Sequence, residues 1–321
     1  MQARAVAALS QLSDSDLRLL RIFKAVTDCG GMASAELELN LAMSTISRHV
    51  KDLETRLGLV LCRRGRAGFV LTPEGEKVYA AAEQLLAAAE TFRGKLNDIH
   101  MRMGGDLHVA VFEKTASNPQ ARIAEAVALF KSKAPQVALH MHVGTITMIE
   151  RGVMDGQYHL GIVPEHRRSE RLTYTPLFNE NMCLYAGARH PWFQIEPDQA
   201  DWAALRTQEL AGLGYHSPNM VLSHERQLAR AATASDQEAV ATLVLSGMYV
   251  GFLPDHYAGL FVNAGRMRVV APGVLNYQCS FSCIHRHSPA PSRVAQAFLD
   301  ALIESHPASL TCRKQQPNFG C

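Results

Sequence analysis

Short hydroxyl side chains and two long cations share one side of a segment in the first quarter of the chain. They are Ser44, Thr45, Ser47, Arg48 and Lys51. Hydroxyl groups of this size bond phosphate oxygens or base edges at close range, and an arginine is long enough to fork onto guanine or to clamp a phosphate. We expect Arg48 to contact a base or a phosphate. The pattern predicts a helix surface that lies in a DNA major groove.

A second group of cations, Arg63, Arg64 and Arg66, follows in a predicted hairpin with a glycine-containing tip. We expect these arginines to track phosphates or the minor groove, which adds affinity and salt dependence rather than sequence choice. Residues 40–72 hold six basic and two acidic side chains, although the whole chain is nearly neutral. The alternative is that these groups only keep a small domain soluble. The agreement of helix lengths, charge and hairpin favours DNA binding.

The elements that must position these groups occur in the order of a winged helix-turn-helix. Ser13 or Ser15 caps a first helix, which ends at Cys29 and two glycines. A short helix over about 32–39 and a turn precede the recognition helix, about 44–57, which Gly58 ends. The inward face of the first helix is predicted to be Leu17, Leu20, Ile22, Phe23 and Val26.

A long helix follows the hairpin. Thr72 and Pro73 form a helix start, and about thirty residues separate them from Gly104 and Gly105. Apolar residues recur along this helix in steps of four and three, which is typical of a coiled-coil seam: Val78, Ala82, Leu85, Ala89, Phe92, Leu96, Ile99 and Met103. The alternative is that the seam packs against the chain's own globular domain. We favour a dimer, because pairing would align two recognition helices with major grooves about 34 Å apart.

After Asp106 the pattern becomes an alternation of strands and helices, which predicts parallel βαβ units. Strands are expected at about 107–112, 137–143, 159–163, 182–186, 211–215, 249–253 and 277–284. Helices are expected at about 121–131, 147–154, 222–231, 236–245 and 292–305. The fold class is therefore α/β with an N-terminal all-α winged helix-turn-helix and a long linker helix.

The first part of this chain resembles the DNA-binding domain of LysR-type transcriptional regulators. The resemblance covers residues 17–76 and includes the run FKAVTDCGGMASAELELNLAMSTISRHVKDLETRLGLVLCRRGRAGFVLTPEGE. The long helix resembles the dimerisation helix of that family. The remainder resembles its effector domain, including YAGARHPW at 185–192 and LVLSGMYVGFLP at 243–254. Two positions depart from the family pattern: Met43 stands where a polar residue is common, and Cys62 stands where phenylalanine is usual.

The resemblance implies a domain organisation. It comprises a DNA-binding domain at 1–72, a dimerisation helix at 73–104, an effector domain at 105–306 and a polar tail at 307–321. The effector domain is similar to periplasmic binding proteins, with subdomain I at about 106–178 and 277–305 and subdomain II at about 179–276. Ligands collect where strand ends meet helix starts, so the implied pocket residues are Thr115, Ser117, Thr145, Thr147, Tyr215, His216 and Ser217. Helix starts favour an anionic or carboxylate effector, although ordinary helix capping would explain each hydroxyl alone.

Composition and motifs exclude several other classes. The seven cysteines are odd in number and scattered, which fits a reduced, cytoplasmic setting. No apolar run is long enough for a membrane span, and no signal peptide is expected. The sequence has no serine elbow, phosphate loop or GxGxxG motif, so we expect no enzyme activity, cofactor or metal.

The sequence therefore predicts a cytoplasmic, ligand-responsive transcription regulator. It would bind inverted-repeat sites on double-stranded DNA as a homodimer or homotetramer. One alternative is a solute-binding protein with an incidental basic N-terminus. Another is a redox or metal sensor, because Cys279 and Cys283 share a strand face with His285 and His287. The two cysteines are too far apart along an extended strand for ideal joint metal ligation.

Overall fold

The computed structural model describes residues 12–65, 68–99, 103–196 and 199–306. The chain divides into two compact units, Met1–Arg93 and Gly94–Cys321, and each is described here by itself. Among the described residues, no helix combines the length and the apolar character that a membrane crossing requires.

The N-terminal unit begins with three helices, α1 (Asp14–Asp28), α2 (Ala35–Leu39) and α3 (Met43–Leu57). Ser13 caps α1 in a reciprocal capping box with Asp16, and Gly58 ends α3 with a left-handed φ of 67°. The predicted order of helices is confirmed. One position of the inward face differs, because Leu19 is buried and Leu17 is only half-buried.

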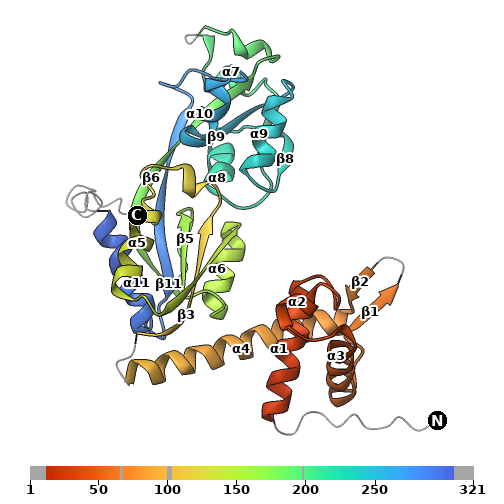
Figure 1. The fold of residues 1–321 in the computed structure, drawn as a ribbon. Helices are drawn as coiled ribbons and strands as arrows, with labels where there is room; N and C mark the ends of the chain where they lie inside the picture. Colours follow the sequence, from red (N-terminus) through yellow and green to blue (C-terminus); the bar gives the residue numbers. More distant parts are fainter. Residues whose placement is uncertain (1–11, 66–67, 100–102, 197–198, 307–321) are drawn as a thin grey trace. The chain divides into compact units, whose positions relative to one another are not determined.

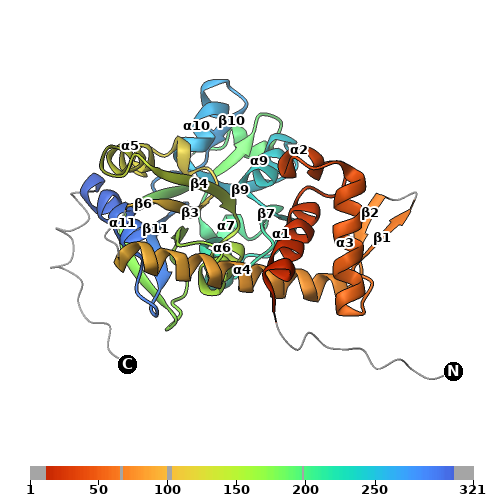
Figure 2. The same cartoon turned by 60° about the horizontal axis from the view of Figure 1, so that its bottom comes forward.

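Two apolar clusters fix the angle between α1 and α3. Phe23, Leu53 and Leu61 belong to one cluster, and Val26 and Ile46 belong to the other. All five side chains are fully buried. Strands β1 (Cys62–Gly65) and β2 (Gly68–Leu71) pair antiparallel and form the wing, which extends beside α3 (Figure 2). The recognition helix is therefore held by its apolar face and leaves its polar face outside.

The long helix α4 (Pro73–Ile99) starts in direct contact with the rest of the N-terminal unit. The Thr72 hydroxyl accepts a hydrogen bond from the Gly75 amide at 2.9 Å and donates to the Val60 carbonyl at 2.6 Å. A Cβ atom at Gly75 would lie 1.9 Å from the Leu61 carbonyl oxygen, so only glycine fits this crossing. The predicted helix start at Thr72 and Pro73 is confirmed.

The C-terminal unit is built on one mixed sheet in the order β4-β3-β5-β11-β6-β9-β7-β8, with β10 paired to β6. Lobe I contains the parallel strands β3 (Gly105–Phe112), β4 (Val137–Gly144) and β5 (Leu160–Pro164). Lobe II contains the parallel strands β7 (Leu210–Leu213), β8 (Arg230–Ala234) and β9 (Val250–Pro254), with β10 (Met267–Val269) at its side. Two long antiparallel strands, β6 (Leu172–Gly187) and β11 (Asn276–Arg286), run through both lobes (Figure 1).

Helices cover the sheet in both lobes. Lobe I carries α5 (Ile123–Lys133), α6 (Ile146–Asp155) and α11 (Arg293–Ser305), with a short 3-10 turn η1 (Thr115–Ser117). Lobe II carries α7 (Trp202–Leu205), α8 (Pro218–Glu225), α9 (Gln237–Leu245) and α10 (Asp255–Asn263), with the turn η2 (Pro191–Phe193). The main apolar cluster continues from lobe I into lobe II, because it includes Phe130, Phe281 and Phe252.

The expectation for lobe II was incomplete. Residues 222–231 were predicted as one helix, but α8 ends at Glu225 and Arg230–Ala234 is strand β8. The strand expected at 182–186 is the last part of the 16-residue β6. Helix α10 and strand β10 were not predicted. Within β8 only Ala234 is buried, so the sequence pattern lacked a clear strand signal there.

Candidate functional site

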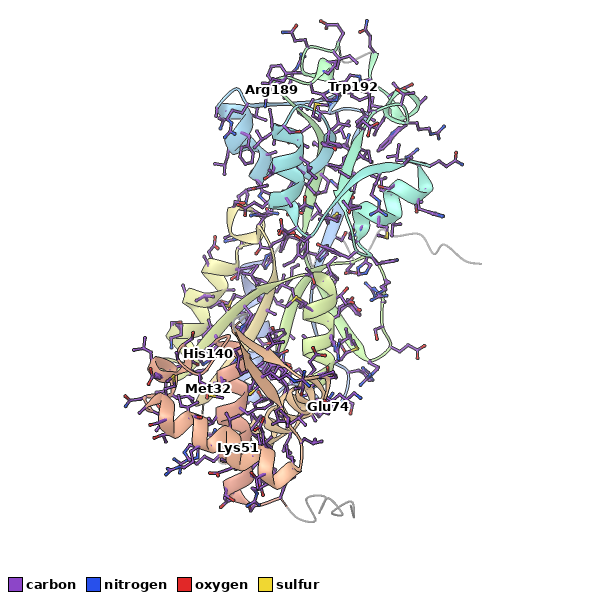
Figure 3. The ribbon with its side chains drawn as sticks, turned by 90° about the vertical axis from the view of Figure 1, so that its right-hand side faces the viewer. Met32, Lys51, Glu74, His140, Arg189 and Trp192 are labelled. Atoms are coloured by element: carbon purple, nitrogen blue, oxygen red, sulfur yellow. The ribbon has the colours of Figure 1, made fainter. Side chains whose placement is uncertain are left out.

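The polar face of α3 is presented outward. Ser44, Arg48 and Lys51 are exposed, and Thr45 and Ser47 are half-buried. On the opposite face Ile46, Val50 and Leu53 are at most 2% exposed. Lys51, marked in Figure 3, lies 3.4 Å from the Glu54 carboxylate, one turn away. The predicted division of this helix into a polar and a packing face is found in the structure.

The start of α3 is held by α2. The Met43 amide donates to the Glu36 carboxylate at 2.5 Å, and no side chain caps the helix at Ala42. The Met43 side chain is 47% exposed, although it is apolar. It stands beside the predicted base-reading residues, which makes it a candidate for apolar contact with a thymine methyl group.

Arg56 contributes to the basic excess of this segment but is engaged inside the protein. Its guanidinium contacts the buried Asp16 carboxylate at 2.5 and 2.9 Å. Hydrogen bonds from Ser13 hold the pKa of Asp16 below its ordinary value, and Arg56 adds to this effect. The pair joins α1 to α3. Arg56 therefore stabilises the domain rather than adding to its DNA-facing charge.

The wing carries the other predicted cations. Arg63 is exposed on β1. Arg64 belongs to the same strand, with its side chain outside the described set, and Arg66 lies outside the described residues. Cys62 is half-buried and packs against the cluster that contains Ile46 and Val50, so its smaller side chain is accommodated in the core.

The seam of α4 divides into two parts. Val78, Ala82 and Leu85 pack against the α1 and α3 cluster, as the alternative explanation of the seam requires. Phe92 and Leu96 are 62% and 40% exposed, and Ala89 is half-buried. The Ile99 side chain lies outside the described set, and Met103 packs on the core of the C-terminal unit. Among the described side chains of this seam, the large exposed ones are therefore Phe92 and Leu96, in the second half of the helix.

Several predicted pocket hydroxyls are used by the backbone. Thr115 is 5% exposed and donates to the Phe112 carbonyl at 3.1 Å. Thr145 caps α6, and the buried Ser217 caps α8. Thr147 is exposed in the first turn of α6. The capping explanation therefore accounts for Thr145 and Ser217.

Side chains that follow the strand ends join the two lobes, and we call this set of contacts the interlobe seam. Lys114 of lobe I contacts Glu238 of lobe II at 2.9 Å. The Glu113 carboxylate accepts a hydrogen bond from the Gln237 backbone amide at 2.9 Å. Two further contacts complete the set: Ser117 to His256 Nδ1 at 2.9 Å, and the rings of His166 and His216 with centroids 4.8 Å apart.

Polar atoms without partners are concentrated at this seam. Within the described part of the chain, the Tyr215 hydroxyl and the Gln237 side-chain oxygen are buried and make no hydrogen bond. Neither ring nitrogen of His166 makes one of normal geometry. Burial lowers the pKa of His166, and Glu150 and the Pro164 carbonyl offset this only in part. Buried polar groups are normally satisfied by protein, ordered water or a ligand, so these atoms make the seam a candidate binding region.

Glu113 is the most perturbed carboxylate of the seam. Burial raises its pKa to about 7, the negative charges of Asp236 and Glu180 add to the rise, and Gln237 and Lys114 oppose it. Sequence reasoning missed Glu113, His166 and Gln237. The signal was present, because each follows the end of a strand (β3, β5 and β8), where an open α/β sheet collects ligands.

A groove of about 360 Å³ borders the seam where β6 crosses between the lobes. It is lined by Asn118, Pro119, Gln120, Asn179, Glu180, Asn181, Asp255 and His256. The His256 ring contacts the Glu180 carboxylate at 2.8 Å, so the groove wall carries a polar pair from β6 and α10.

The two cysteines of β11 are poorly suited to redox chemistry. Cys279 is 5% exposed and Cys283 is fully buried. Burial raises the pKa of the Cys283 thiol to about 12 and raises that of Cys279 further. The thiolate is the reactive form of cysteine. Among the described residues, no three histidine, cysteine or acidic side chains are arranged to hold a metal ion.

Two family models match this chain. Residues 17–76 match the model of the bacterial regulatory helix-turn-helix protein, lysR family, and residues 102–307 match the LysR substrate binding domain. The chain belongs to the LysR family. It is a ligand-responsive, DNA-binding transcription regulator, and its relatives are regulators rather than enzymes. The two matched domains give it DNA and a small-molecule effector as partners.

Among the relatives of this LysR-family regulator is the HTH-type transcriptional activator BauR of Pseudomonas aeruginosa. The two are 39% identical over 298 residues, which are 93% of this chain and 98% of BauR. A probable regulator, LrrA of Synechococcus elongatus, is 27% identical over 73% of this chain and 79% of LrrA.

Solved structures of full-length regulators share the fold. CbnR complexed with its target DNA has a TM-score of 0.60 at 21% identity and covers 90% of this chain and 99% of CbnR. A full-length OxyR variant of Pseudomonas aeruginosa has a TM-score of 0.56 at 21% identity and covers 96% of this chain and 99% of that one. The predicted fold class is confirmed.

Proposed function

We propose that this LysR-family regulator activates transcription from inverted-repeat sites, that α3 and the wing read the DNA, and that the interlobe seam binds the effector. The similarity to the activator BauR supports the direction of control. Such a regulator acts in the cytoplasm, where bacterial DNA lies. The proposed domains remain 1–72, 73–104 and 105–306. The observation that carries the DNA-binding proposal is the outward polar face of α3, with Ser44, Arg48 and Lys51 exposed over a fully packed apolar face.

Within this proposal Arg48 reads a base edge, and Ser44, Thr45 and Ser47 allow close approach to the DNA. Lys51 and the wing arginines Arg63, Arg64 and Arg66 neutralise phosphates. The CbnR structure supports this placement, because a protein of the same fold is there complexed with its target DNA. A bidentate arginine contact to guanine contributes about 1 to 3 kcal/mol of discrimination against the wrong base.

The test compares Arg48→Ala with Arg151→Ala, which removes one exposed charge from α6 in the other unit. Binding to a selected duplex and to a scrambled duplex is measured by fluorescence anisotropy over a range of salt. If Arg48 reads a base, R48A weakens selected-site binding by about 1 to 3 kcal/mol and reduces the preference over scrambled DNA. R151A is expected to behave as wild type. An R48A protein with unchanged affinity and preference would remove Arg48 from the reading surface.

We further propose that Phe92 and Leu96 lie in the dimer contact of α4, with Ala89 and Ile99 along the same seam, whereas Met103 packs on the core of its own C-terminal unit. Both large side chains are exposed within a single chain, and burying a side chain of this size contributes about 1.5 to 3 kcal/mol. The first three seam positions, Val78, Ala82 and Leu85, would then anchor the helix to its own DNA-binding domain.

This contact is tested by sedimentation velocity of Phe92→Asp. The matched control is Val274→Asp, at an apolar position that is 47% exposed. F92D is expected to shift the protein toward the monomer and to weaken binding to a two-half-site duplex, whereas V274D keeps the wild-type assembly. Equal assembly of F92D and wild type would exclude Phe92 from the contact.

The effector proposal rests on the unpaired hydroxyl of Tyr215 at the seam. In this arrangement Ser117, Thr147 and His216 border the bound molecule, and Thr115, Thr145 and Ser217 position the loops around it. Tyr215→Phe removes only the hydroxyl, and Tyr249→Phe makes the same change at a half-buried residue beside β9. In a reporter assay, Y215F is expected to need more effector for the same response, with DNA binding unchanged. An identical dose response in Y215F and Y249F would contradict the proposal.

A further inference from the structure

Three carboxylates, those of Glu113, Asp236 and Glu180, influence one another at the interlobe seam. Glu113 and Asp236 lie close enough to the Tyr215 hydroxyl to raise its pKa, in addition to the larger effect of burial. Glu180 also acts on Glu113. Among the described residues, the Glu113 carboxylate accepts one hydrogen bond, from the Gln237 backbone amide at 2.9 Å. The seam therefore offers carboxylate oxygens to a bound donor.

The nearby cation does not neutralise this charge. Lys114 extends to Glu238 at 2.9 Å, and its ammonium group lies 4.7 Å from the centroid of the Tyr257 ring. Its charge pulls the pKa of Glu113 down, yet that pKa remains at about 7. Burial is the largest cause of this raised pKa, and Lys114, whose ammonium group is paired with Glu238, opposes it only in part.

An independent observation points to a missing donor. Gln237 is 3% exposed, and its side-chain oxygen makes no hydrogen bond within the described part of the chain. Its backbone amide is the group that contacts Glu113, so Gln237 borders the same acidic centre. A buried acceptor without a donor destabilises the folded state, and a ligand that brings N–H groups would satisfy it.

The helix starts that suggested an anionic effector are occupied by the protein itself. Thr145 caps α6, and Ser217 caps α8. At α9, Asp236 caps the helix, and the Glu113 carboxylate accepts a hydrogen bond from the backbone amide of Gln237, the first residue of the helix. An anion placed at α9 would have to displace a carboxylate and then face Asp236.

We propose that the effector of this regulator carries a positively charged amino group, which binds among the Glu113 carboxylate, the Gln237 side-chain oxygen and the Tyr215 hydroxyl. This inference rests on the proposed effector site at the interlobe seam. An ammonium group offers three N–H donors and no acceptor, which matches three groups that can all accept. The effector is either a small simple amine or a small amino acid, and the test distinguishes these two classes.

The proposal has a consequence for pH. Glu113 must be ionised to pair with an ammonium group, so a proton and the amine compete for the same carboxylate. The charged or titratable groups that face Glu113 are Lys114, Glu180, Tyr215, Asp236 and Tyr257. Since the pKa of Glu113 is about 7 before binding, affinity should increase as the pH rises from about 6 to about 8 and then level off.

The experiment measures thermal stabilisation of the full chain by matched pairs of compounds. Putrescine is paired with 1,4-butanediol, 4-aminobutyrate with butyrate, and methylammonium with sodium at equal ionic strength. Each is titrated into wild type, Glu113→Gln and Glu225→Gln. E113Q keeps a side-chain oxygen that can accept from the Gln237 backbone amide, so it should fold. E225Q removes an exposed charge at the end of α8, outside the contacts that define the interlobe seam.

The expected result is saturable stabilisation by at least one amine of the set, absent for its amine-free partner. E113Q should weaken the binding of that amine at pH 8 at least roughly ten-fold, as loss of a charged hydrogen bond predicts, and should remove its pH dependence. E225Q should keep both. Preference for 4-aminobutyrate over putrescine would identify an amino acid, and the reverse preference would identify a simple amine.

Three results would overturn the inference: stabilisation only by amine-free compounds, amine binding that survives in E113Q, or no stabilisation by any amine. Reporter and footprint measurements separate these from failure of the proposed function. The protein could bind its DNA site and respond through Tyr215 to an effector without an amino group. That result would refute only the inference that the effector carries an amino group. A response that is unaffected by Y215F would refute the seam as the effector site.

Discussion

Replacement of Gly75 by alanine tests how the recognition domain is joined to the long helix. The Cβ atom of alanine would lie 1.9 Å from the Leu61 carbonyl oxygen and 2.8 Å from its carbonyl carbon. Contacts under 3.0 Å to backbone are essentially never seen, so the first turn of α4 must move away by about 1 Å. Neither neighbour is a flexible side chain that could yield instead.

The cost follows from the contacts that this shift disturbs. Thr72 bridges the same crossing through hydrogen bonds of 2.6 Å to the Val60 carbonyl and 2.9 Å from the Gly75 amide, and its own amide donates to Leu61 at 3.0 Å. Loss of one of these hydrogen bonds costs about 1 kcal/mol, and overpacking at Gly75 adds about 1 to 3 kcal/mol. We therefore expect G75A to lower the free energy of unfolding of the N-terminal unit by about 2 to 4 kcal/mol.

Urea unfolding followed by circular dichroism measures this change, and DNA binding is measured in parallel. The matched control is Gly104→Ala, because a Cβ atom there meets nothing within 4 Å. G104A should unfold within about 0.5 kcal/mol of wild type, as is usual for substitutions away from packed sites. If G75A is as stable as wild type and binds DNA equally well, the described crossing of α4 over Leu61 is incorrect.

Two other substitutions or treatments probe the C-terminal unit. Burial and the neighbouring His140, His159 and His142 lower the pKa of His108 to about 4. The neutral form of His108 therefore contributes stability to the folded protein. This contribution is fully present above the pKa of about 6.5 that histidine has in the unfolded chain, and it is lost as the pH falls toward 4. H108Q should therefore lose less thermal stability between pH 7 and pH 5 than wild type, as calorimetry would show. Parallel losses would argue against a neutral, half-buried imidazole at His108. Burial raises the pKa of Cys283 to about 12. Iodoacetamide at pH 8 should therefore leave Cys279 and Cys283 unmodified in the folded protein and modify both in urea. Rapid labelling of the folded protein, detected by mass spectrometry, would restore the redox hypothesis.

Much of the N-terminal unit could be predicted because its signals are local. Ser13, Gly58 and Thr72 mark helix ends through their own backbone and side-chain chemistry, and each acts as predicted. The role of Arg56 could not be predicted in this way. Its partner Asp16 is 40 residues away, so only the packing of α1 on α3 reveals that this charge is used inside the protein.

Lobe II was harder to predict because its strands are short and depend on neighbours that are distant in the chain. Strand β8 has few buried side chains and gains its order from pairing with β7, which the pattern of Arg230–Ala234 does not show. The seam was missed for a similar reason. Glu113 and Gln237 are 124 residues apart, and hydroxyl groups drew the prediction toward Thr145 and Ser217, which cap helices.

Selection of binding sites from a random duplex library tests the central claim most directly. The full-length protein is incubated with the library at physiological salt, and bound DNA is recovered and sequenced. If two copies present paired α3 helices, the enriched sequences should contain an inverted repeat whose half-sites are one or more helical turns apart, about 10 base pairs for each turn. An enriched single half-site, or no enrichment over the starting library, would contradict the account of this protein as a paired, sequence-specific DNA reader.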